Sequence, residues 1–250
     1  MNAAEFSELL QRRRSIRSFL STPLPDGAVD EILEDARHIP SWSNTRPYCV
    51  AVASGEQLER LRERYVEAFD ASLVLRAHTK SDKTNDVTSP SPEDLANLTP
   101  LGTPDGDFTT RLRYPNELRE RSRACGLGLY SQLGIARDDA VGRQDAARRN
   151  LAFFGAPTAM WIFVHESMLP FSAQDAGILL HTILLSAQVR GIDSCPLGEL
   201  ATWRHPVDSE FDVPEGYQLI TGLALGYRSD DAVNQFHADH PPVTRVVTAR

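Results

Sequence analysis

Four arginines and one serine lie within six residues near the amino end of the sequence: Arg12, Arg13, Arg14, Ser15 and Arg17. Guanidinium groups beside a hydroxyl suit a phosphate monoester, because they donate paired, charge-assisted hydrogen bonds to its oxygens. The apolar neighbours Ile16 and Phe19 should be buried and would hold the segment extended, so that Arg13, Ser15 and Arg17 share a face. A solvated basic patch would have the same composition, so this run alone leaves both interpretations open.

Two later stretches also contain groups that can bind a ligand. Residues 40–48 are dense in hydroxyl and amide side chains and lead into an apolar run. Residues 191–199 combine glycines with a proline, and a turn there can expose backbone N–H groups. Each stretch is a weak signal on its own.

Three other features favour structural roles. Gly126 and Gly128 resemble the start of a dinucleotide-binding loop, but the third glycine is missing and the surrounding pattern is helical. His237 and His240 lie near prolines without a companion cluster of ligands, so we expect no metal site. Cys195 precedes a proline and has no evident histidine partner, which favours a thiol packed in the core.

The composition argues against several classes of protein. Among 250 residues, 26 are Lys or Arg and 34 are acidic, and the net charge of −8 argues against a protein that coats nucleic acid. No apolar run approaches the roughly 20 residues that a membrane span needs, and the first residues do not resemble a secretion signal. Three cysteines without a C-x-x-C pair indicate no disulfide framework, so we expect a cytoplasmic protein.

Hydrophobic periodicity predicts interspersed helices and strands. Apolar residues at helical spacing predict helices over 29–36, 58–69, 116–133 and 176–187, with Asp26 as the N-cap of the first. Short apolar or β-branched runs predict strands at 48–53, 158–164 and 218–226, and an edge strand at 246–247. Residues 77–111 show little periodicity and contain four prolines, which predicts an irregular lid or insertion. These elements indicate an α+β fold around a modest sheet.

The order and spacing of these stretches resemble the FMN-dependent nitroreductase family. Its members carry an R-R-S-x-R-x-F start, a P-S-x-x-N-x-Q-P-W loop, and a late helix followed by G-L-x-x-x-P-x-G. The corresponding segments here are residues 13–19, 40–48 and 191–198, and further matches at 114–119, 129–135, 153–157 and 173–177 extend the resemblance over nearly the whole chain. The weakest region is 77–111.

The resemblance implies a single three-layer domain over residues 1–250. Its central, mostly antiparallel β-sheet would be flanked by helices, and extensions would span a homodimer with one FMN in each of two interface sites. Arg13, Arg14 and Ser15 would contact the phosphate and ribityl chain of FMN, and Arg17 would lie at the pyrimidine edge of the flavin.

The remaining site residues follow from the other two motifs. The loop residues that would reach across from the partner subunit are Pro40, Ser41, Trp42 and Asn44. Pro196, Leu197 and Gly198 would line one face of the ring. The backbone N–H of Gly198 or Glu199 would hydrogen-bond flavin N5, the atom that exchanges hydride.

The implied activity is hydride transfer from NADPH or NADH through FMN to a nitroaromatic, a quinone or another flat conjugated acceptor. The segment 77–111 would cover the flavin and influence the choice of acceptor. Two alternatives stay open: another chemistry on the same scaffold, such as reductive dehalogenation or biosynthetic dehydrogenation, and a non-catalytic FMN-binding protein.

The sequence departs from the family pattern in two places. Arg46 and Tyr48 replace the usual glutamine and tryptophan of the loop. The family also ends with a segment whose basic residues complete the phosphate site, and His237 and His240 occupy those positions here. Histidine, unlike arginine, carries much of its charge only below neutral pH.

We therefore predict that FMN is held less tightly as the pH rises from about 6 to 8, because deprotonated histidines no longer attract the phosphate. The FMN dissociation constant, measured by titration across this range, tests the prediction. A flat profile would show that His237 and His240 do not contact the phosphate.

Overall fold

Four strands form one antiparallel sheet at the centre of the structure. The computed structural model describes residues 2–80, 91–110 and 113–244. The strands are β1 (Tyr48–Ser54), β2 (Thr158–His165), β3 (Asp193–Leu197) and β4 (Tyr217–Gly226), in the spatial order β1-β2-β4-β3. Each neighbouring pair is antiparallel, with one register shift between Ile162 and Phe163.

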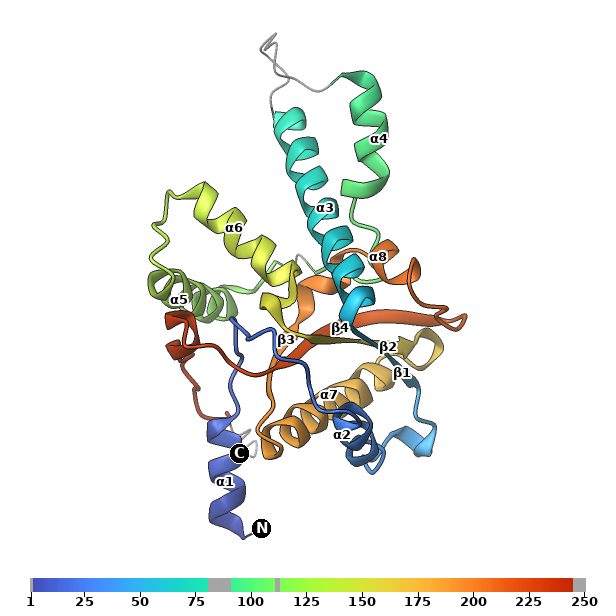
Figure 1. The fold of residues 1–250 in the computed structure, drawn as a ribbon, viewed down its shortest axis with the longest axis vertical. Coiled ribbons are helices and arrows are strands. Elements are labelled where there is room, and N and C mark those ends of the chain that lie inside the picture. The colour runs from blue at the N-terminus through green and yellow to red at the C-terminus, as the bar shows by residue number, and fades with distance from the viewer. Residues whose placement is uncertain (1, 81–90, 111–112, 245–250) are drawn as a thin grey trace, which may run out of the picture.

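Helices surround this sheet (Figure 1). The α-helices are α1 (Ala3–Arg12), α2 (Ala28–Ala36), α3 (Gly55–Lys80), α4 (Pro92–Gly102), α5 (Asn116–Gln132), α6 (Ala140–Leu151), α7 (Phe171–Val189) and α8 (His205–Asp208). The short 3-10 helices are η1 (Trp42–Asn44), η2 (Phe153–Gly155), η3 (Glu166–Met168), η4 (Gly198–Thr202) and η5 (Ala232–Gln235). None of the described helices combines the length and the apolar character that crossing a membrane requires.

Strand β2 is buried on both faces and divides the core into two layers. Met160, Ile162 and Val164 pack with α2 and α7 on one side. Trp161 and Phe163 face the other side, where α3 and η4 cover the sheet. A central strand with helices on both faces needs a continuous apolar run, and β2 has one from Ala159 to Val164. The prediction of an α+β fold with an antiparallel sheet flanked by helices is confirmed.

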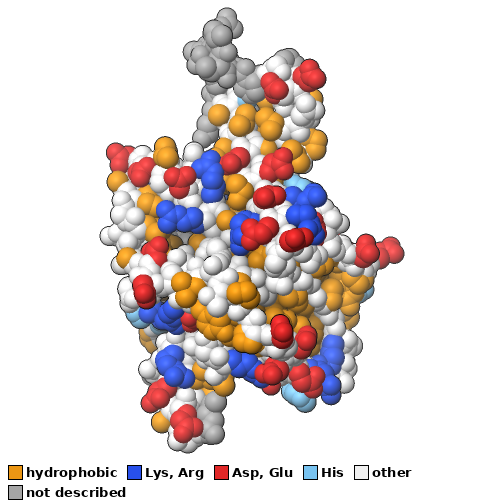
Figure 2. Space-filling model, viewed as in Figure 1, with side chains coloured by type: hydrophobic (Ala, Val, Ile, Leu, Met, Phe, Trp, Pro, Cys, Tyr) orange, Lys and Arg blue, Asp and Glu red, His pale blue; other side chains and the backbone are white. Residues whose placement is uncertain are grey.

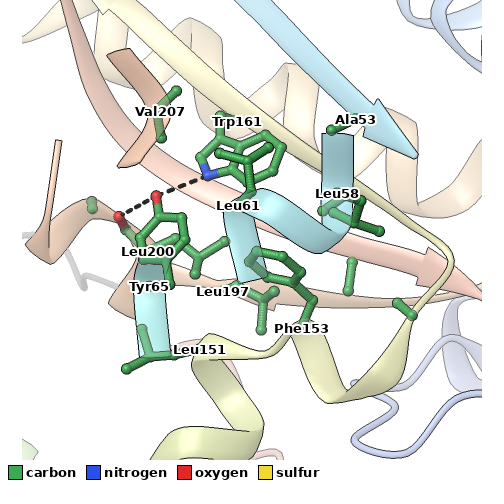
Figure 3. Close-up of a cluster of buried hydrophobic side chains, with 14 of the residues drawn as sticks. Ala53, Leu58, Leu61, Tyr65, Leu151, Phe153, Trp161, Leu197, Leu200 and Val207 are labelled. Atoms are coloured by element: carbon green, nitrogen blue, oxygen red, sulfur yellow. Dashed lines mark hydrogen bonds between the residues drawn. The ribbon is translucent and has the colours of Figure 1, made fainter. Parts of the chain in front are cut away.

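Tyr65 of α3 joins the helix to the sheet and to η4 (Figure 3). Its hydroxyl donates a hydrogen bond to the Leu200 carbonyl and accepts one from Trp161 Nε1, both at 3.0 Å. The Phe153 ring packs edge-on against Tyr65 at 5.8 Å between centroids. Burial raises the pKa of Tyr65, so the hydroxyl stays protonated and both hydrogen bonds are retained.

Helices α3 and α4 form an arm that extends from the body of the molecule (Figure 1). The prediction of irregular structure over 77–111 is wrong for the end of α3, which continues to Lys80, and for α4, which begins at a capping box between Ser91 and Asp94. Pro92 is tolerated because it falls in the first turn, where backbone N–H groups have no intrahelical acceptor. Residues 81–90 lie outside the described residues.

Glycine allows α4 to approach α3 closely. A Cβ added to Gly102 would lie 2.6 Å from the backbone of Ala71 and Ser72. This close contact packs the end of α4 against the middle of α3.

Three further predictions need comment. The N-cap of α2 is Gly27 in the left-handed region, and no side chain caps the helix, so the assignment of that role to Asp26 is wrong. The stretch 191–199, expected as a turn, is strand β3 followed by η4. The edge strand expected at 246–247 lies outside the described residues.

Replacing Tyr65 by phenylalanine should lower the free energy of unfolding by about 1–3 kcal/mol, because the Leu200 carbonyl and Trp161 Nε1 both lose their buried partner. Urea denaturation measures this difference. Tyr217→Phe is the control, since the hydroxyl of Tyr217 makes no hydrogen bond to the described residues. Equal stabilities for the two variants would contradict the role given to Tyr65.

Candidate active site

The amino-terminal segment crosses the free edge of β3. Ile16 N donates to the Ser194 carbonyl at 3.0 Å, and Phe19 N donates to the Phe154 carbonyl at 3.1 Å. Ile16 is fully buried and Phe19 is 8% exposed, which confirms that these two residues pin the segment. The side chains of Arg13, Ser15 and Arg17 are half-buried between the segment and the sheet.

Cys195 of β3 lies among these three side chains. Burial raises the pKa of Cys195 to about 11, against the opposing effects of the Arg17 and Arg13 charges and a hydrogen bond with Ser15. The thiol is therefore protonated at neutral pH, and the expectation of a core thiol is confirmed. The same contacts show that the arginine motif and β3 meet in one place.

The chain turns from β3 into η4 at an open position. Leu197 is buried, whereas Gly198 is exposed and an added Cβ would meet no atom within 4 Å. As the first residue of η4, Gly198 has a backbone N–H without an acceptor inside the helix. The structure thus places a backbone donor in open space at the end of β3.

A cavity of about 260 Å³ adjoins this turn and is lined by Arg17, Glu199, Tyr130, Asn150 and Phe154, among others. The side-chain oxygen Oδ1 of Asn150 is buried and has no hydrogen-bond partner among the described residues. A buried polar atom without a partner is costly, so a ligand that supplies one would be favoured there.

Of the residues that line this cavity, Arg17 and Glu199 were predicted from the sequence, whereas Tyr130, Asn150 and Phe154 were not. Phe153 and Phe154 both have positive φ, at 56° and 53°, a conformation that is unusual for bulky residues and concentrates at functional sites. The F-F-G-A-P stretch contributed to the family resemblance but carried no assigned role. Nothing in the sequence distinguishes Asn150 from other polar helix residues.

Arg14 faces the carboxy-terminal segment. Its Nη2 donates to the carbonyls of Asn234 and Phe236, at 2.7 and 2.8 Å. Burial and, to a smaller extent, the charge of Arg228 lower the pKa of Arg14. Arg14 therefore anchors the segment after η5, and its expected contact with a phosphate stays a prediction.

The two histidines lie at the surface of that carboxy-terminal segment. His237 is exposed and lines a cleft of about 480 Å³ that it shares with Arg121 and Cys125 of α5. His240 is also exposed. Within the described part of the chain, no hydrogen bond joins either histidine to Arg13 or Ser15.

The loop 40–46 is held far from the arginine motif, beside the opposite edge strand, β1. Trp42 N donates to Asp175 Oδ2 at 2.9 Å, and the Trp42 ring stacks on Phe171 at 3.9 Å between centroids. The Ser41 hydroxyl accepts from Arg46 N, and Asn44 has a φ of 55°. Pro40 is exposed. One chain therefore does not bring Pro40, Ser41, Trp42 and Asn44 next to Arg13.

Comparison with known proteins places this α+β chain in one family. The model of the nitroreductase family matches residues 10–227, and the chain belongs to this family. A 4-nitrobenzoate reductase from Pseudomonas putida is 28% identical over 228 residues, which cover 91% of this chain and 87% of that protein. Nitroreductase NfnB from Mycolicibacterium smegmatis is 32% identical over 224 residues, covering 90% and 83%.

The solved structures agree. The crystal structure of the FMN-dependent nitroreductase NfnB from Mycobacterium smegmatis in complex with NADPH superposes with a TM-score of 0.79 and 30% sequence identity. The alignment covers 99% of this chain and 100% of that one. The family resemblance inferred from the motifs is confirmed.

Substituting Arg14 by lysine should loosen the carboxy-terminal segment, because one ammonium on a flexible stem cannot hold two carbonyls in the geometry of a guanidinium. We expect faster amide hydrogen exchange in residues 232–240 and a loss of about 1 kcal/mol in unfolding free energy. Hydrogen exchange with mass spectrometry measures the first and denaturation the second.

Arg13→Lys is the matched control for exchange, since Arg13 makes no hydrogen bond to the described part of that segment. If both variants exchange alike in residues 232–240, Arg14 is not the anchor.

Proposed function

We propose that this protein binds FMN and transfers hydride from NADPH or NADH to flat conjugated acceptors such as nitroaromatics and quinones. The observation that carries the proposal is the position of the arginine motif on β3. Arg13, Ser15 and Arg17 lie near Cys195, three residues before the exposed Gly198, and Arg17 and Glu199 line one cavity. The names of the relatives, a 4-nitrobenzoate reductase and an FMN-dependent nitroreductase crystallised with NADPH, support the same cofactors and acceptor class.

The residues present fit FMN. Guanidinium and hydroxyl groups at Arg13 and Ser15 match a phosphate monoester. The pyrimidine edge of a flavin offers both donors and acceptors, and the unpaired Oδ1 of Asn150 next to Arg17 supplies a complementary pair. The chemistry that bound FMN supplies is hydride transfer through N5 between the nicotinamide and the acceptor.

The protein's part in the reaction is positioning and electrostatics. The backbone N–H of Gly198 or Glu199 would donate to flavin N5, and Pro196 and Leu197 would line one face of the ring. The guanidinium group of Arg17 would stabilise negative charge on the reduced flavin. Preorganised donors of this kind act without reorganisation during the reaction.

The active form we propose is a homodimer. The loop 40–46 and the arginine motif lie at opposite edges of the sheet, so a second copy is needed to bring Trp42 and Asn44 to the flavin. Trp42 is 48% exposed and Phe171 is 37% exposed, and this apolar pair suits burial against a partner. Three free cysteines support a cytoplasmic location.

The decisive experiment is the visible absorption spectrum of the purified protein before and after anaerobic addition of NADPH or NADH. We expect a flavin spectrum that bleaches with the nicotinamide and returns when a nitroaromatic acceptor is added. A colourless protein that cannot be reconstituted with FMN would refute the proposal.

Two further outcomes separate the alternatives. A flavin that does not bleach with either nicotinamide would indicate a non-catalytic FMN-binding protein. Recovery of colour only with halogenated acceptors would indicate reductive dehalogenation. Gel filtration of the same preparation tests the dimer.

A further inference from the structure

We infer that Arg204 is a positioning residue that ties the α3–α4 arm to η4 and so fixes the backbone amides of Gly198 and Glu199. The inference rests on the proposed function, because it assigns those amides to the flavin. Arg204 itself lies two residues after the end of η4, and none of its hydrogen bonds is to a residue of the proposed flavin site.

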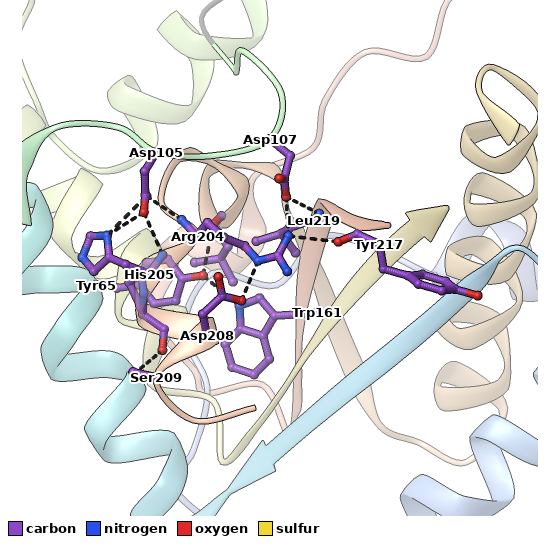
Figure 4. A network of polar contacts seen from close by, with 12 residues as sticks. Tyr65, Asp105, Asp107, Trp161, Arg204, His205, Asp208, Ser209, Tyr217 and Leu219 are labelled. Atoms are coloured by element: carbon purple, nitrogen blue, oxygen red, sulfur yellow. Dashed lines mark hydrogen bonds and ion pairs between the residues drawn. The ribbon is translucent and has the colours of Figure 1, made fainter. Parts of the chain in front are cut away.

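Arg204 joins three parts of the chain through one guanidinium group (Figure 4). Its Nη1 donates to Asp107 Oδ2 at 2.6 Å and to the Tyr217 carbonyl at 3.1 Å. Its Nε donates to Asp208 Oδ1 at 2.7 Å. The Arg204 side chain is 15% exposed and lies 5.2 Å from the centre of the Phe163 ring, and Asp107 is 21% exposed, so this ion pair is partly shielded from solvent. Asp208 is 48% exposed.

Asp105 and Asp107, which follow α4, bond the end of the arm to α8 and β4. Asp105 accepts hydrogen bonds from the backbone N–H groups of Arg204 and His205, at 2.7 and 3.1 Å, which are free donors at the start of α8. Asp107 Oδ2 also accepts from Leu219 N of β4, at 2.6 Å. The end of the arm is thereby bonded to α8 and to the central sheet.

The same segment lies directly on the last turn of η4. Gly106 N donates to the Thr202 carbonyl at 3.1 Å, and the hydroxyls of Thr110 and Thr202 are 2.8 Å apart. A Cβ at Gly106 would lie 1.9 Å from the Ala201 carbonyl oxygen, so only glycine permits this approach. Thr202 ends η4, and Gly198 begins it four residues earlier.

The core gives η4 a second support. Tyr65 holds the Leu200 carbonyl, and Leu200 is fully buried. With Tyr65 bonded at Leu200 and the 105–110 segment bonded at Thr202, η4 has little freedom to shift. Loss of Arg204 leaves Asp107 and Asp208 without their cation. We expect the 105–110 segment to separate from η4, which then keeps only its contact with Tyr65.

The experiment compares Arg204→Met and Asp107→Asn with Arg60→Met. Arg60 makes a two-point ion pair with Glu210, at 2.9 Å for both bonds. The substitution Arg60→Met therefore removes an ion pair that does not touch η4. Asp107→Asn keeps the size of the side chain and removes only its charge, so it is informative even if Arg204→Met does not fold. Three quantities are measured: amide exchange of residues 198–202, the reduction potential of bound FMN, and kcat and KM separately.

For Arg204→Met and Asp107→Asn we expect faster exchange in residues 198–202, a shifted flavin potential, and a kcat lower by about tenfold to a hundredfold, since small displacements of reacting groups have effects of this size. FMN should stay bound, because the arginine motif is untouched. Arg60→Met should match the wild type in all three quantities.

Unchanged exchange and an unchanged flavin potential in folded Arg204→Met and Asp107→Asn would overturn the inference. A loss of stability without those changes has the same meaning, because it shows a merely structural ion pair. If the wild type binds no FMN, the proposed function fails, whereas exchange in the FMN-free proteins still decides whether Arg204 holds η4.

Discussion

The docking of the amino-terminal segment on β3 is the interaction on which the candidate site depends. β3 is an edge strand, and an edge leaves backbone groups without partners. The bond from Ile16 N to the Ser194 carbonyl satisfies one of them, and the buried Ile16 side chain holds the segment in register. Without this contact the arginines of the motif would be a basic patch in solvent. With it, Arg13 and Arg17 lie beside β3, which leads into the exposed turn at Gly198.

The arginines of this acidic protein divide into two kinds. Arg228 donates to both carboxylate oxygens of the buried Asp193, and Arg204 binds Asp107 and Asp208, so these cations hold structure. Arg13 and Arg17 form no ion pair within the described part of the chain. Figure 2 shows acidic and basic side chains interspersed over one face of the molecule. Positive charge that no carboxylate neutralises is available to an anionic ligand.

The sequence predicted the elements that have strong periodicity and missed those that depend on tertiary contacts. The strands β2 and β4 and the helix α7 follow directly from their apolar patterns. β3 is short, contains Pro196 and shows no alternation, so only its pairing with β4 makes it a strand. In α4, two prolines hide the helix. Pro92 falls in the first turn, where no intrahelical hydrogen bond is lost, whereas Pro100 lies inside the helix and removes one.

The same distinction applies to the site. The arginine motif was recognisable because its chemistry resides in side chains at fixed spacing. The role of Arg14 was not, since the carbonyls of Asn234 and Phe236 leave no pattern in the letters of a sequence. The unpaired oxygen of Asn150 is likewise a property of packing. Only the folded chain shows which polar groups lack partners.

A site that relies on backbone donors places unusual demands on the scaffold. A side-chain acid can be adjusted by one substitution, whereas an amide moves only if its main chain moves. In this protein the main chain at Gly198 is continuous with η4, and η4 is held by the core at Leu200 and by the arm at Thr202. The arm is also the region expected to influence the acceptor. If Arg204 holds the arm against η4 as inferred, a change in the arm that alters the choice of acceptor also shifts the backbone amides of Gly198 and Glu199. Substrate preference and flavin reactivity are then coupled through one short helix rather than set independently.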